Sequence, residues 1–142
     1  MALYSIARRT TNTTSNNAAH TLITTSTDRA ALLEKGVFMA AATASTYSVG
    51  RPAANGVTPT SPAALQAVDP ASPAATVTSA LAWGTSPTNP TADLRRWASP
   101  ATIGAGVIWT FPRGLLIPVS ANLVLQNLAT NGAVDTYDDI DE

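Results

Sequence analysis

The chain has 142 residues, a length that suits one domain with one hydrophobic core. Its net charge is −1 and only 12% of its residues are charged, so it lacks the basic surface that nucleic-acid binding requires. It contains no cysteine, which excludes disulfides and thiolate metal sites and suits assembly in a reducing cytoplasm. We find neither a signal-peptide pattern nor an apolar stretch long enough for a membrane helix, and therefore expect a soluble protein without a membrane partner.

Short candidate strands recur roughly every 10–15 residues, a spacing typical of β-sandwiches and barrels. Ten prolines and eight glycines are spread through the chain and interrupt every run that favours a helix. The sequence therefore predicts a single all-β domain. The expected strands, in chain order, are residues 3–8, 19–25, 32–40, 43–49, 64–68, 76–83, 94–98, 107–111, 122–127 and 134–140.

Turn chemistry separates these strands. Asn131-Gly132 is the strongest hairpin signal, and Pro112-Arg113-Gly114 predicts a turn after residue 111. Residues 51–63 and 84–93 are too long and too proline-rich for tight turns, so we expect two exposed, extended loops. The polar, Thr- and Asn-rich start of the chain predicts a strand or docking arm over residues 1–18, with the sandwich domain over 19–142.

The sequence offers no convincing catalytic, cofactor or metal site. His20 is the only histidine and lies in a strand-like run, where a structural role is more common than catalysis. One histidine cannot supply a zinc site. Five acidic residues gather between Asp135 and Glu142, and we interpret them as a solvated tail or a charged strand edge. We therefore predict that the protein is not an enzyme.

The candidate interface residues come from the two arginine doublets. Arginine beside an aromatic residue is a common energetic anchor at protein interfaces. The low charge also favours association over a monomeric state. The predicted interface residues are Arg8, Arg9, Arg95, Arg96 and Trp97.

Two stretches carry a resemblance to a known group of proteins. Residues 50–60, with 33–37 and 40–44 before them, look like small structural proteins of tailed bacteriophages. Residues 109–118, followed by 122–127, are similar to the closing strands of β-sandwich virion domains. The resemblance implies a jelly-roll-like antiparallel β-sandwich that acts as a head decoration, or cement, protein. Lys35 departs from it, because an apolar residue is expected there in a buried strand.

From this resemblance we expect a homo-oligomer, with a trimer favoured, that binds the major capsid protein or other virion subunits. The protein would lie on the outer capsid surface after assembly in the host cytoplasm. One alternative is a tail, neck or fibre adaptor. Another is a carbohydrate-binding module, in which Trp83 beside the 84–93 loop would stack on sugar rings.

Overall fold

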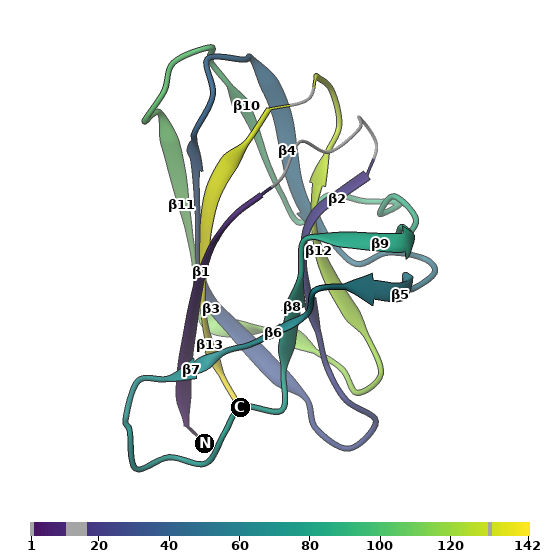
Figure 1. Ribbon diagram of the computed structural model, residues 1–142, viewed down its shortest axis with the longest axis vertical. Helices are drawn as coiled ribbons and strands as arrows, with labels where there is room; N and C mark the ends of the chain where they lie inside the picture. The colour runs from purple at the N-terminus through teal and green to yellow at the C-terminus, as the bar shows by residue number, and fades with distance from the viewer. Residues whose placement is uncertain (1, 11–16, 131) are drawn as a thin grey trace.

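The computed structural model describes residues 2–10, 17–130 and 132–142, and its elements are all β-strands. Two antiparallel sheets pack face to face as a β-sandwich (Figure 1). The first sheet has the order β11-β3-β13-β1-β7 and the second has the order β10-β4-β12-β2-β8-β6. The strands are β1 (Leu3–Arg9), β2 (Asn17–Ile23), β3 (Ala30–Met39), β4 (Ser45–Gly50), β5 (Val57–Thr60), β6 (Ala63–Ala64), β7 (Gln66–Ala67), β8 (Thr78–Ala80), β9 (Ala82–Thr85), β10 (Arg95–Ser99), β11 (Gly106–Ile117), β12 (Asn122–Asn127) and β13 (Val134–Asp141).

The strand pairing is nested along the chain. β1 pairs with β13, β2 with β12, β3 with β11, and β4 with β10, all antiparallel. The first and third pairs belong to one sheet, and the second and fourth belong to the other. The chain thus folds back on itself at residues 51–94, and the doubled chain wraps around one core.

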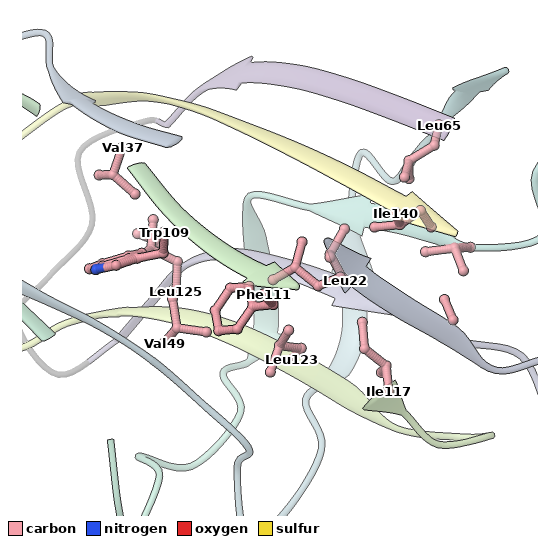
Figure 2. Close-up of a cluster of buried hydrophobic side chains, with 14 of the residues drawn as sticks. Leu22, Val37, Val49, Leu65, Trp109, Phe111, Ile117, Leu123, Leu125 and Ile140 are labelled. Atoms are coloured by element: carbon pink, nitrogen blue, oxygen red, sulfur yellow. The ribbon is translucent and has the colours of Figure 1, made fainter. Parts of the chain in front are cut away.

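The core lies between the two sheets (Figure 2). Apolar side chains from both layers meet there, because alternate residues of a strand point to opposite faces. Both sheets contribute large side chains with at most 8% exposure, among them Leu22, Val37, Val49, Trp109, Phe111, Ile117, Leu123, Leu125 and Ile140. Cores of this kind provide most of the favourable free energy of folding.

Residues 51–94 close one side of the sandwich. Within this segment, β7 pairs with the edge of β1, and β8 pairs with the edge of β2. Leu65 lies between β6 in one sheet and β7 in the other, and it is buried in the core. β5 and β9 form a separate two-stranded sheet of the same segment, drawn beside β12 and β2 in Figure 1.

The all-β prediction is confirmed, and several local predictions need correction. The expected turn at Pro112 lies inside β11, where the pairing with β3 shifts between Thr110 and Leu115 as at a bulge. β12 and β13 lie in different sheets, so their connection crosses the sandwich and is not a hairpin. Asn131 itself is outside the described residues. The 51–63 loop also contains strand β5.

The N-terminal segment is a strand of the sandwich over its described part up to Arg9. β1 lies between β13 and β7, and seven consecutive residues pair with β13. Tyr4 reaches the core, where it is 2% exposed, and its hydroxyl donates a hydrogen bond to the carbonyl of Pro73. A detachable arm would show neither feature. Residues 11–16 are outside the described part.

Truncation that restarts the chain at Thr10 tests this arrangement. We expect the truncated protein to lose its cooperative thermal transition, because β13 loses a partner strand and the core loses Tyr4. Circular dichroism melting measures the effect. Ala7→Ser, on an exposed position of the same strand, serves as the control and should melt like the parent chain. An unchanged melt of the truncated chain would contradict an integral β1.

Candidate functional site

The sandwich has one side without the covering segment, formed by β10 and β11. Within the described part of the chain, each is the last strand of its sheet and pairs with one neighbour. The Arg95 guanidinium lies 5.0 Å from the centre of the Phe111 ring and so joins the two edges by a cation–π contact. The predicted arginine–aromatic cluster therefore lies on an open side of the molecule, which we call the β10–β11 edge.

The three predicted residues of β10 differ in their contacts. Arg96 forms an exposed ion pair with Asp93, with Nη1 3.1 Å from Oδ2. Trp97 is half-buried and stacks on Tyr47 at a centroid distance of 6.5 Å, so part of its ring belongs to the core. Arg95 is exposed and is the residue of the three that reaches across to β11.

β11 adds exposed apolar surface to this edge. Ile108 is 51% exposed, although it lies within a strand. A shallow pocket of about 370 Å³ runs between Arg95 and the bulged part of β11, with Phe111, Pro112 and Leu115 in its lining. An unpaired strand edge beside apolar side chains is a ready surface for another protein chain.

Arg8 and Arg9 lie elsewhere. They belong to β1, which is separated from β11 by β13 and β3 in the same sheet. Arg8 donates to the carbonyl of Ser79 at 3.1 Å, and Arg9 forms a two-pronged ion pair with Asp135 at 2.7 and 2.8 Å. The hydrogen bond to Arg9 lowers the pKa of Asp135. The structure therefore does not join the two arginine doublets into one patch, and both residues of this doublet have intramolecular partners.

Trp83 has intramolecular partners too. Its indole Nε1 donates to Thr21 Oγ1 at 3.2 Å, and its ring packs against Gly56, where an added Cβ would lie 2.4 Å from the ring. The side chain is half-buried. A ring covered in this way presents less surface for stacking on a sugar than the sequence suggests.

A second feature lies in the core, where three polar side chains meet. Lys35 Nζ is 2.7 Å from Oδ1 and 3.0 Å from Oδ2 of Asp138. His20 Nδ1 is 3.3 Å from Asp138 Oδ2 and 3.4 Å from Lys35 Nζ. Lys35 is 3% exposed, Asp138 0% and His20 1%. We call these three residues the buried cluster.

The buried cluster links the two sheets. Lys35 on β3 and Asp138 on β13 are directly opposite each other in the register of the first sheet. His20 comes from β2 in the second sheet. Leucine and valine side chains enclose the ion pair and leave no room for a water molecule beside it. The two charges therefore compensate each other in an apolar interior.

Burial shifts the pKa values of His20 and Asp138 in this cluster. Desolvation, followed by the positive charges of Lys35 and Arg8, lowers the pKa of His20 well below its usual range. The imidazole is therefore neutral, and its Nε2 has no hydrogen-bond partner in the described structure. Desolvation also raises the pKa of Asp138, against the attraction of Lys35.

The sequence interpretation noted Lys35 as unexpected in a buried strand but missed Asp138 and the pairing of the two residues. The acidic end of the chain is neither a solvated tail nor a strand edge, because β13 lies between β3 and β1. Its side chains alternate, so Asp138 points inward with Ile140, while Asp139 points outward and is half-buried. The available signal was the single lysine of the chain, placed in an alternating run with Val37 and Met39.

No family model, curated protein or solved structure matches this chain. Among residues 2–10, 17–130 and 132–142, the structure has no helix that is long and apolar enough to cross a membrane. The same residues include no group of three or more His, Cys, Asp or Glu side chains placed to hold a metal ion.

Asp138→Leu tests the energetic role of the buried cluster. The substitution leaves the Lys35 amine buried without its partner, and such a loss costs about 3–5 kcal/mol of unfolding free energy. Urea denaturation measures it. Asp139→Leu is the matched control on the outer face of the same strand, for which we expect a change of at most about 1 kcal/mol. Equal effects of the two substitutions would contradict the assignment.

The neutral state of His20 predicts a pH dependence of stability. Because its folded pKa is lowered, the unfolded chain binds a proton at His20 below about pH 6.5 and the folded chain does not. Stability from this residue is therefore present above that pH and lost as the pH falls below it. Asp138 acts in the opposite direction, since its raised pKa favours the folded state at low pH.

Comparison with the His20→Gln variant isolates the contribution of His20 to the pH dependence of stability. We expect the melting temperature of the parent chain to fall more steeply than that of the variant between about pH 6.5 and 5. Thermal melts at fixed ionic strength measure the difference between the two curves. Parallel curves would show that His20 titrates normally in the folded state.

Proposed function

We propose that this chain is a virion structural protein, a capsid decoration (cement) protein that binds the outer capsid lattice as a homotrimer and stabilises the particle without catalysis. The observation that carries the proposal is the open β10–β11 edge on a weakly charged sandwich. That edge exposes Ile108 on β11, and Arg95 lines a shallow pocket beside the bulged part of the same strand. Surfaces of this composition suit protein–protein contacts.

The strand order is also compatible with the proposed role as a virion protein. We infer that the eight principal strands form a jelly roll, because β1-β13-β3-β11 and β2-β12-β4-β10 result from rolling up one doubled chain. Double-sheet jelly rolls occur in viral capsid proteins, lectin domains and cupins. The fold is compatible with several functions, so the proposal draws its support from the exposed edge and not from the fold.

A decoration role matches the physical character of this edge. Many copies of a modest interface on one particle together give a large stabilisation, so no single contact has to be strong.

β11 can pair with a strand of another copy along only part of its length. Its second half is bulged and contains Pro112, which has no N–H to donate, whereas the first half from Gly106 to Thr110 pairs regularly with β3. We assign the contact between copies to this first half.

Self-association gives the first test. We expect the parent chain to sediment as a trimer at micromolar concentration, and Ile108→Asp to weaken association by about 2 kcal/mol by placing a charge in the interface. Val68→Asp is the control, because Val68 is similarly exposed next to β7 at the other end of the same sheet. Sedimentation velocity distinguishes the states. A monomeric parent chain would contradict the trimer.

Location on a particle gives the second arm of the same test. Antibody-gold labelling of particles from a culture that makes the protein should place it over the capsid. Labelling of the tail, neck or fibres would favour the adaptor alternative. Unlabelled particles, with the protein free in the lysate, would overturn the virion assignment.

A further inference from the structure

The buried cluster places a primary amine against a carboxyl group in a dry interior. We propose that Lys35 and Asp138 condense within the folded chain to an isopeptide bond, which joins Nζ of Lys35 to Cγ of Asp138. This bond would tie β3 covalently to β13. The inference concerns the interior of one chain and does not depend on the proposed function.

The geometry brings the reacting atoms together. Lys35 Nζ contacts both oxygens of Asp138 at 2.7 and 3.0 Å, so the carbon between them lies within the roughly 3.5 Å of a near-attack arrangement. The two residues are cross-strand partners in neighbouring strands. Each strand is also paired on its other side, β3 with β11 and β13 with β1. The sheet therefore fixes both side chains at their bases and makes the reaction effectively unimolecular.

The environment favours the reactive, un-ionised form of the Asp138 carboxyl group. Condensation needs a neutral amine and an un-ionised carboxyl group, which form when the lysine proton passes to Asp138. In water this transfer is unfavourable, but desolvation penalises the charged carboxylate in the interior. Burial raises the pKa of Asp138, which favours its acid form. Apolar neighbours such as Leu22, Val49 and Leu125 surround the pair and keep water away from it.

His20 is placed to transfer the proton during the reaction. A single ring nitrogen, Nδ1, lies within 3.4 Å of both the amine and the carboxyl oxygen Oδ2. The imidazole is neutral, and in its Nε2–H tautomer Nδ1 can accept a proton. The other ring nitrogen, Nε2, has no hydrogen-bond partner in the described structure.

The steps balance without any further reactant. The Lys35 amine attacks Cγ of Asp138, and the new N–C bond gives a tetrahedral intermediate. Nδ1 of His20 accepts a proton from the attacking nitrogen and returns it to the departing hydroxyl group. The C–O bond breaks, one water molecule leaves, and a neutral amide remains. The product removes two charges from the core, which an ion pair would retain.

Intact-mass spectrometry of the denatured full chain tests the proposal directly. We expect a mass lower than that of the sequence by one water molecule. Lys35 is the only lysine, so an amine-reactive label on the denatured protein, located by peptide mapping to separate it from the N-terminal α-amine, reports whether its side chain is free. A tryptic digest should contain a branched peptide that joins the Lys35 segment to the segment beginning at Gly114. That peptide also distinguishes the bond from a dehydrated aspartate elsewhere in the chain.

Variants assign the bond to its residues. Lys35→Met and Asp138→Leu should keep the full sequence mass, whereas Asp139→Asn should still lose one water molecule. His20→Gln should convert at least roughly 100-fold more slowly, seen as unreacted chain that loses water on incubation. A fully reacted His20→Gln protein would overturn the role of His20.

Measurements on the parent protein test the proposed bond even if the variants fail to fold. A full sequence mass with a labelled Lys35, unchanged after prolonged incubation of the native protein, would overturn the bond. A branched peptide through another carboxylate would overturn the assignment to Asp138. The oligomeric state and the particle location have separate readouts, so failure of this proposal and failure of the proposed function are distinguishable.

Discussion

The nested antiparallel pairing is the constraint on which the structure depends. Because β1 pairs with β13, the first and last strands of the chain must meet before the first sheet is complete. The remaining three pairs lie progressively closer to the middle of the chain. Pairings so distant in sequence make folding slow, since the entropy of closing each loop precedes the contacts that stabilise it. The position of every core side chain follows from this arrangement.

The buried cluster depends on the pairing of β3 with β13. Lys35 and Asp138 are neighbours only because β3 and β13 are paired in one register, and a slip of β13 by one residue would turn Asp138 outward and leave Lys35 without it. His20 joins them from the opposite sheet, so the polar contact also fixes how the sheets face each other. Buried polar groups of this kind can specify one arrangement of a core that apolar packing alone leaves less defined.

The two sides of the sandwich differ in how their edges are covered. On one side the 51–94 segment pairs with β1 and β2 and places Leu65 between the sheets. On the other side β10 and β11 are joined by the contact of Arg95 with Phe111 and leave Ile108 exposed. The bulge at Pro112 restricts pairing along half of β11. The regularly paired part of β11 is therefore short, from Gly106 to Thr110.

The sequence by itself determined the fold class and the places of most strands. Alternating apolar residues, β-branched side chains and turn residues act locally, so their signals are present in any short window. The strand at Asn122–Asn127 was predicted with its observed bounds. The same local logic failed at Pro112, because a bulge and a turn use the same residues, and only the partner strand distinguishes them.

Only the tertiary structure decided which strands pair and which charges are buried. An acidic segment such as residues 135–142 is usually solvated, and local sequence gives no reason to place Asp138 in a core. The reason lies more than a hundred positions away in β3, where Lys35 supplies the compensating charge. Likewise, Arg8 and Arg95 carry similar local patterns, yet the strand order puts one beside a covered edge and the other on an open one. Long-range pairing decides such questions, because it determines the neighbours that make a charge or an edge stable.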